Sequence, residues 1–329
     1  MTINHLNTTA LHTQHQQLNA KLVDFCGWEL PIHYGSQIAE HNAVRQYAGI
    51  FDVSHMGVVD IAGPSATALL RYTLANNIDK LDINNKALYS CMLNPQGGII
   101  DDLIVYRLNT DHYRLVINAA RRETDLNWLI KINEIFDANI ITHNDHAIIA
   151  VQGPMARTLI QDFTGESVLS LKRFHCLHQN DMIIARTGYT GEDGVECILP
   201  NAQAESFWKH CIKKGIQPCG LGARDSLRLE AGLNLYGTDM NTDTSPLISN
   251  LAWTVCFKDE QRDFIGKSAL INQENSGIKQ QLTGVIMRTR GVLRCHQPLL
   301  SNGEVIGEIT SGGFSPTLNL ALHALDLLP

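Results

Sequence analysis

The alternation of apolar and polar residues divides the chain into short strands and amphipathic helices. Strands are predicted at residues 21–25, 50–56, 99–106, 112–118 and 195–199. Residues 27–31, Gly-Trp-Glu-Leu-Pro, read as a turn that ends the first strand. A helix should follow Ser36, a suitable N-cap, with Glu40 in its first turn and Gly49 at its stop. Further helices are expected at about 123–136 and 202–214.

Two segments resemble each other. Residues 59–66 and 149–156 each run from a strand through Gly-Pro into a helix, with Pro64 and Pro154 placed to open the helices. This similarity suggests a duplicated α+β half. Coincidence is the alternative, because Gly-Pro before a helix is common, and the sequence alone leaves both open.

The composition changes to a β type near the C-terminal end. After polar residues 272–281, strand-like segments with turns follow at 281–288, 292–300 and 304–310. A separate small β domain should therefore begin near residue 280. It is expected to be incomplete, since about four short strands do not close a barrel.

Charge and cysteine usage restrict the class of protein. The chain of 329 residues has 26 Lys and Arg against 33 Asp and Glu, a formal net charge of -7, which argues against a nucleic-acid or anionic-membrane surface. The eight cysteines form no CxxC pair, as expected of reduced thiols, and this pattern disfavours zinc. With neither a signal-like start nor a long apolar run, we expect a soluble, cytoplasmic protein.

The strongest candidate for chemistry is the stretch from Tyr89 to Tyr106. It combines a Pro/Gly turn with two adjacent carboxylates, Asp101 and Asp102, at the entrance to a buried strand. Strand alternation separates the pair, placing Asp102 with Tyr106 and Asp101 with Val105. The alternative is a surface turn whose acids cap the strand entry.

Other candidates carry weaker patterns. Glu196 follows a glycine-bracketed turn into a strand, and Asn118 adds an amide that can donate and accept. Arg224 suits planar, bidentate recognition, although beside Asp225 an internal ion pair is the commoner outcome. The glycine-rich loop before Arg224 lacks P-loop spacing. The segment His175-Cys-Leu-His is a poor metal motif without a fourth spaced ligand, and no Gly-x-Ser-x-Gly elbow supports a hydrolase triad.

Taken together, these segments resemble the glycine cleavage T-protein family of aminomethyltransferases. The resemblance covers about residues 20 to 318 and is carried by the segments at 34–41, 51–56, 87–94, 97–106, 188–196, 222–232 and 310–318. It implies a mixed α+β, three-part fold around a central hole that holds tetrahydrofolate. It also implies domains formed by 1–50 with 147–278, by 51–146, and by a shortened β-barrel domain at 279–329.

The same resemblance implies the reaction and the residues. Family members release ammonia from the aminomethyl-lipoyl arm of the H-protein and leave 5,10-methylenetetrahydrofolate, with no metal. The essential acid matches Asp102, while Glu196 and Arg224 should hold the pterin edge. The other residues expected to line the cavity are Met56, Tyr89, Tyr106, Asn118, Tyr189 and Tyr236.

The C-terminal end of the chain leaves other functions open. Residues 319–329 depart from the strand pattern expected of the family and stop early, so an inactive homologue that retains folate or H-protein binding is one alternative. A folate-binding helper of iron–sulfur assembly is another alternative. Such helpers carry a segment of the type Lys-Gly-Cys-Tyr-x-Gly-Gln, whereas residues 186–192 of this chain are Arg-Thr-Gly-Tyr-Thr-Gly-Glu, which argues against this alternative. Folate domains of dimethylglycine or sarcosine dehydrogenases accompany a flavin domain, and no dinucleotide fingerprint is present.

Overall fold

The computed structural model describes residues 5–179, 181–289, 291 and 294–327. Its contacts divide the chain into two compact units. The first unit contains the chain up to Met56 together with His143–Ala231, and the second contains Gly57–Thr142 and the chain from Gly232 onward. Residues 232–278 therefore group with the second unit, and the three-part division given above stays a prediction.

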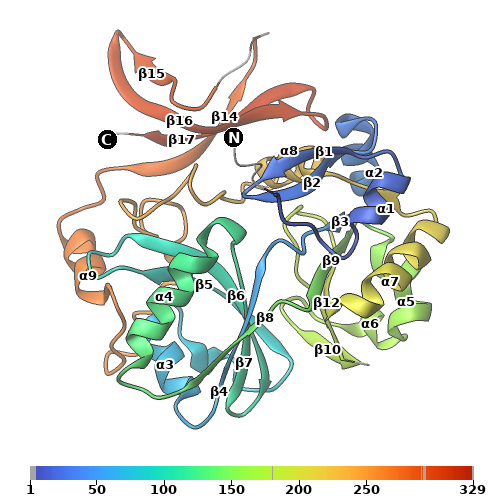
Figure 1. The fold of residues 1–329 in the computed structure, drawn as a ribbon. Coiled ribbons are helices and arrows are strands. Elements are labelled where there is room, and N and C mark those ends of the chain that lie inside the picture. Colours follow the sequence, from blue (N-terminus) through green and yellow to red (C-terminus); the bar gives the residue numbers. More distant parts are fainter. Residues whose placement is uncertain (1–4, 180, 290, 292–293, 328–329) are drawn as a thin grey trace. The chain divides into compact units, whose positions relative to one another are not determined.

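The first unit is built on a six-stranded sheet with the order β10-β11-β12-β9-β3-β13. Helices α5 and α7 cover it, because Ile160, Phe207 and Trp208 are buried against the strand residues Ile149 and Val151 (Figure 1). The bounds are β3 Gly49–Asp52, β9 His146–Gln152, α5 Ala156–Thr164, α6 Ser167–Ser170, β10 Cys176–Gln179, β11 Met182–Ala185, β12 Gly194–Pro200, α7 Asn201–Lys213 and β13 Gln217–Pro218.

The N-terminal part of this unit confirms one helix prediction and corrects one turn. Ser36 caps α2, since its hydroxyl accepts from the backbone N–H of Ala39 at 3.3 Å. The predicted turn at 27–31 is wrong, because Cys26 and Gly27 take left-handed φ values of 54° and 79° and close a hairpin in which Pro31 is already in the strand. The elements are α1 His12–Gln17, β1 Lys21–Phe25, β2 Trp28–His33, α2 Gln37–Gln46 and α8 Leu221–Glu230.

The second unit contains a five-stranded sheet with the order β5-β6-β7-β4-β8. Helices α3 and α4 pack on it through a core that includes Leu69, Leu70, Leu103, Val105 and Leu129. The bounds are β4 Gly57–Ala62, α3 Ala66–Thr73, η1 Ile78–Lys80, β5 Lys86–Leu93, β6 Ile99–Asn109, β7 His112–Ile117, η2 Ala119–Arg121, α4 Arg122–Asn133, β8 Asn139–His143, η3 Ala252–Thr254 and α9 Lys267–Asn275.

The two sheets share one succession of elements, which supports the duplication hypothesis. In each, a strand leads through Gly-Pro into a helix, an antiparallel meander of three strands follows, and a second helix comes next. The backbone N–H of Gly63 donates to Asp111 O at 2.9 Å, and that of Gly153 donates to Asp193 O at 2.7 Å. Both glycines have positive φ, at 98° and 127°, so the same tight turn requires glycine twice.

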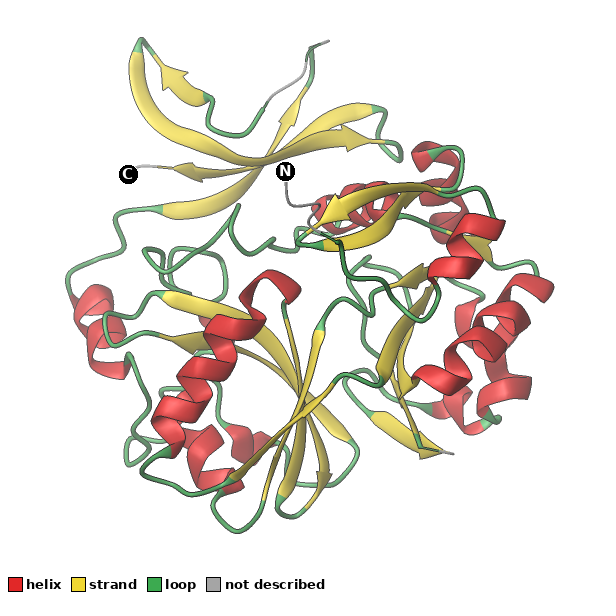
Figure 2. Cartoon of the chain, viewed as in Figure 1, coloured by secondary structure: helices red, strands yellow, loops and turns green. Residues whose placement is uncertain are grey.

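The C-terminal segment forms an antiparallel sheet with the order β14-β17-β16-β15, and over its described residues Figure 2 shows strands and loops without a helix. Its strands are β14 Gln281–Met287, β15 Pro298–Ser301, β16 Glu304–Ser315 and β17 Leu320–Leu327. The sheet is not closed, as expected. The expectation that 319–329 leaves the strand pattern is wrong, because β17 pairs with both β14 and β16. Of the strand expected at 292–300, residues 292–293 lie outside the described residues.

Candidate functional site

The candidate residues form two groups, one in each unit. Asp102, Tyr89, Tyr106, Asn118 and Tyr236 belong to the second unit. The first-unit group consists of Met56, Tyr189, Glu196 and Arg224.

Asp102 lies near the start of β6, behind a tightly fixed turn. The side chain of Asn94 accepts hydrogen bonds from the backbone N–H groups of Gln96 and Gly98, at 3.0 and 2.9 Å. A Cβ on Gly98 would overlap the carbonyl oxygen of Thr242, so only glycine fits there. The turn therefore fixes the point at which β6 begins and, through it, the position of Asp102.

Asn118 joins the two adjacent aspartates. Its Nδ2 lies 2.9 Å from Asp101 Oδ1 and 2.9 Å from Asp102 Oδ1, and its backbone N–H donates to Asp101 Oδ2 at 3.1 Å. Asn118 directly follows β7, the neighbour of β6, which brings it beside Asp102. The surface-capping alternative is wrong, because Asp101 is fully buried and Asp102 is half-buried.

Aromatic side chains surround this pair. The Tyr89 hydroxyl donates to Asp102 Oδ2 at 2.8 Å, and its ring stacks on Trp253 at 5.5 Å between centroids. Tyr236 donates to the carbonyl of Ile99 at 3.0 Å, while the Arg121 guanidinium lies 5.0 Å from the centre of its ring. Tyr106 shares the Asp102 face of β6, as alternation predicts, but is buried.

The surroundings of Asp102 make it a weak acid. Burial, followed by the charge of Asp101, raises its pKa to about 7, while the hydrogen bonds from Tyr89 and Asn118 act in the opposite direction. A carboxyl group with such a pKa can accept and return a proton near neutral pH.

The first-unit group is centred on Glu196 of β12. The Thr187 hydroxyl donates to Glu196 Oε2 at 2.6 Å, and burial raises the pKa of Glu196. Arg224, in α8, has its guanidinium 4.3 Å from the centre of the Tyr189 ring. The expectation of an ion pair between Arg224 and Asp225 is wrong, because Asp225 Oδ1 pairs instead with Arg228 Nε at 2.9 Å. The charge of Arg224 lowers the pKa of Glu196, and the charge of Glu196 raises that of Arg224, so each group favours the charged form of the other.

Met56 lies half-buried next to an unusual histidine. Burial, followed by the positive charge of Arg224, lowers the pKa of His55 to about 4. Its Nδ1 is buried without a hydrogen-bond partner among the described residues. The imidazole is therefore neutral at neutral pH.

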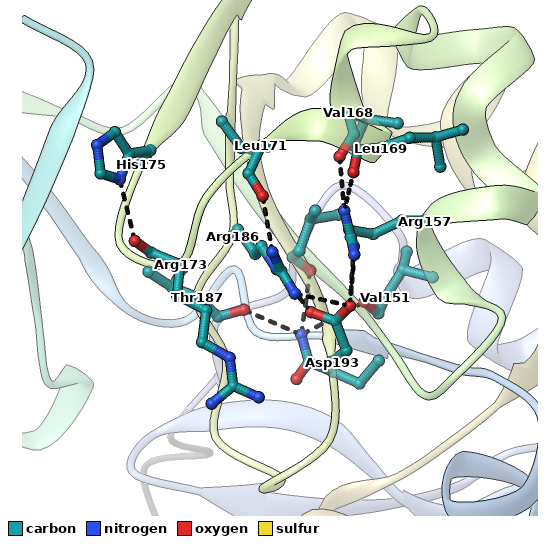
Figure 3. A network of polar contacts seen from close by, with 12 residues as sticks. Val151, Arg157, Val168, Leu169, Leu171, Arg173, His175, Arg186, Thr187 and Asp193 are labelled. Atoms are coloured by element: carbon teal, nitrogen blue, oxygen red, sulfur yellow. Dashed lines mark hydrogen bonds and ion pairs between the residues drawn. The ribbon is translucent and has the colours of Figure 1, made fainter.

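A polar network braces the turn that carries Tyr189. Asp193 accepts hydrogen bonds from Arg186 Nε at 2.8 Å and Arg157 Nε at 2.9 Å, and Figure 3 shows its carboxylate between the two guanidinium groups. The same arginines donate to the carbonyls of Val168 and Leu171. Asp193 therefore acts as a structural acid that holds this turn in place.

The metal candidates are not part of either group. His175 Nδ1 contacts the carbonyl of Arg173 at 3.0 Å, and Cys176 is buried in β10. Within the described ranges, ligand atoms of His143, Asp145 and His146 lie within 4.8 Å of one another, at the start of β9.

Several residues that contact the candidate site residues were not predicted from the sequence. Thr187, Arg121 and Trp253 carry no motif by themselves, and only their partners reveal them. For Thr187, its position next to the glycine turn at 188 was the one available indication.

Comparison with known proteins covers nearly the whole chain. The GCVT N-terminal domain matches residues 11–259, and the glycine cleavage T-protein C-terminal barrel domain matches residues 280–322. An aminomethyltransferase of Xanthomonas axonopodis pv. citri is 52% identical over 324 residues, which cover 95% of this chain and 87% of that protein. One of Alcanivorax borkumensis is 53% identical over 326 residues, covering 98% and 89%.

A solved structure gives the same result. The crystal structure of glycine cleavage system aminomethyltransferase T from Bartonella henselae has a TM-score of 0.94 and 35% identity, and covers 98% of this chain and 90% of that one. Among the described residues, no helix combines the length and apolar character needed to cross a membrane.

Proposed function

This chain belongs to the glycine cleavage T-protein family of aminomethyltransferases, and we propose that it transfers the aminomethyl carbon of a lipoylated H-protein to tetrahydrofolate. The observation that carries the proposal is Asp102, a half-buried carboxyl group held by Tyr89 and Asn118. The family membership supplies the reaction, and this geometry supplies the group that can move a proton in it.

The reaction balances without an oxidant. The carbon of the S–CH2–NH2 group leaves both sulfur and nitrogen and forms two bonds to folate nitrogens. The two folate N–H protons end on the departing ammonia and on the lipoyl thiol. A proton must therefore move from an attacking amine to a leaving group, which a carboxyl group with a pKa near 7 is suited to carry.

We assign that proton transfer to Asp102. As a carboxylate it orients and polarises the attacking folate nitrogen, and as an acid it returns a proton while ammonia leaves. General acid–base catalysis of this kind contributes about 10²- to 10⁴-fold. No step requires a metal ion.

We assign recognition of the pterin to the first-unit group. The 2-amino-4-oxopyrimidine edge offers N–H donors to a carboxylate and an oxygen acceptor to a guanidinium, which suits Glu196 and Arg224. In the first unit we assign further contacts with folate to Tyr189 and Met56, and in the second unit to Tyr89, Tyr236 and Asn118. Tyr106 is buried and is therefore left out of this set.

The cellular compartment is inferred from the thiols. All eight cysteines are free, and six of them are buried. Free thiols are typical of a reducing interior, so we place the protein in the cytoplasm.

The test measures ammonia release from aminomethylated H-protein, with and without tetrahydrofolate, for the unmutated chain and for Asp102→Asn. We expect folate-dependent release that falls by at least about 10²-fold in the variant. Folate binding without any release would favour the inactive, folate-binding homologue. Equal rates for the two proteins would remove Asp102 from its role.

A further inference from the structure

Asp125 is a buried acid that the proposed reaction does not use. It lies in the first turn of α4 and is fully buried. Neither of its carboxyl oxygens receives a hydrogen bond from an N–H or O–H donor among the described residues. A buried carboxylate without any donor would be very costly, so this side chain needs another explanation.

The group that Asp125 meets is a second carboxyl. The charge of Asp101 acts on the side chain of Asp125, which shows that the two carboxyl groups are close neighbours. Two carboxyl groups in such contact must share a proton, because two neighbouring negative charges cannot both stay ionised away from water. Asp101 already accepts two hydrogen bonds from Asn118, whereas Asp125 has none of this kind, so the proton belongs on Asp125.

We propose that Asp125 holds a proton and donates it in a hydrogen bond to Asp101, and that it thereby acts as a positioning residue for Asp102. The chain of contacts runs from Asp125 to Asp101, through the amide of Asn118, to Asp102. This inference rests on the proposed function, in which Asp102 moves the proton.

The charged and titratable groups around Asp125 agree with a neutral acid. Burial, followed by the charge of Asp101, raises the pKa of Asp125 to about 10, and Arg121 opposes this shift without cancelling it. Asp102 also raises the pKa of Asp125. Tyr236 interacts with the same three aspartates and is a neutral phenol at neutral pH, because burial raises its pKa to about 12.

The consequence for Asp102 follows from charge. A proton fixed on Asp125 allows Asp101 to remain a carboxylate, which accepts from both the backbone and the side chain of Asn118. The charge of Asp101 is in turn one of the causes that raise the pKa of Asp102. Asp125 therefore sets both the orientation and the proton affinity of the working carboxyl without touching it.

The first experiment detects the proton directly and does not depend on activity. Infrared difference spectra of the unmutated chain against Asp125→Asn, at pH 7.5, should show the C=O stretch of a protonated carboxyl that the variant lacks. The matched control is Glu123→Gln, which removes an exposed acid from the same turn of α4. Carbon-13 NMR titration of the aspartate-labelled unmutated chain answers the same question without a substitution. Absence of a protonated carboxyl at this pH in both measurements would overturn the proposal.

The second experiment tests the positioning role. In Asp125→Ala, Asp101 loses its donor and takes up a proton, which removes the neighbouring charge. The acidic limb of the kcat/KM profile for ammonia release should then move to lower pH, and kcat should fall about 10- to 100-fold. In Asp125→Asn the amide N–H still donates to Asp101, so the limb should stay close to that of the unmutated chain.

The outcomes separate this inference from the proposed function. A fall in activity for Asp125→Ala with an unchanged acidic limb would indicate a merely structural role and overturn the inference. Absence of activity in the unmutated chain would instead contradict the transferase assignment, while the spectra would still report whether Asp125 is protonated.

Discussion

Asn118 Nδ2 lies 2.9 Å from Asp102 Oδ1, because Asp102 lies in β6 and Asn118 directly follows the neighbouring strand β7. The same amide nitrogen reaches Asp101, so one side chain holds two carboxyl groups that would otherwise repel each other. Asn118 is therefore central to the second-unit group.

We predict that Asn118→Ala lowers kcat for ammonia release by about 10- to 100-fold, because Asp102 loses its orientation. Urea unfolding should also show a loss of about 1–3 kcal/mol, since Asp101 and Asp102 are left with fewer donors. Asn118→Asp places a third carboxyl group in the cluster and should be at least as harmful. Activity close to that of the unmutated chain in both variants would contradict this role.

Tyr89→Phe should move the pH dependence in a defined direction. The Tyr89 hydroxyl lowers the pKa of Asp102, so its loss should raise that pKa above about 7. If the carboxylate is the working form, the acidic limb of kcat/KM should shift to higher pH by about one unit, with activity recovering in more alkaline buffer. Tyr113→Phe, which removes a different tyrosine hydroxyl bond in this unit, is the control. An unshifted limb would show that Tyr89 does not tune Asp102.

Thr187→Val should change folate recognition more than chemistry. The Thr187 hydroxyl is a 2.6 Å donor to Glu196, and its removal should raise the pKa of Glu196 further. We expect the KM for tetrahydrofolate to rise about tenfold, with kcat changing less. The exposed Thr142→Val serves as the control. A selective loss of kcat would place Glu196 in the chemical step instead.

Gly98→Ala should destabilise the second unit strongly. The added Cβ would overlap the carbonyl of Thr242, and the backbone at this turn cannot yield without moving β6. The expected loss in the free energy of unfolding is about 3 kcal/mol or more. Gly284→Ala meets no atom within 4 Å and should change stability by about 0.5 kcal/mol or less. Equal stabilities for the two variants would refute the close approach of the Thr242 carbonyl to Gly98.

Asp193→Asn should lower the free energy of unfolding of the first unit at neutral pH, and this loss should become smaller in acid. Burial opposes ionisation of Asp193, but the hydrogen bonds from Arg186 and Arg157 outweigh it and lower the pKa below 3.8. The stability from this depressed pKa is present above about pH 3.8 and is lost as pH falls through the lower folded value. The half-exposed network should contribute about 1–2 kcal/mol at neutral pH. Denaturant unfolding from pH 7 to 2 should show the difference shrinking in acid; a constant difference would contradict this account.

Local signals were sufficient for much of the fold. The Ser36 cap, the strand at Lys21–Phe25 and the two Gly-Pro helix starts follow from side-chain chemistry near each residue. Two of the sequence predictions were wrong at places where the backbone conformation depends on pairing with another strand. The left-handed pair Cys26 and Gly27 converts a predicted turn into a hairpin, and β17 becomes a strand because two neighbouring strands pair with it.

The sequence by itself determined that Asp101 and Asp102 lie on opposite faces of β6, because alternation is a local property of an extended chain. It could not show the partners of Asp102, since Tyr89 and Asn118 reach it through the pairing of separate strands. Only tertiary structure placed Asp125 of α4 against Asp101 and removed both from water. Proton affinity depends on burial and neighbouring charge, and both are set by packing between elements far apart in the chain.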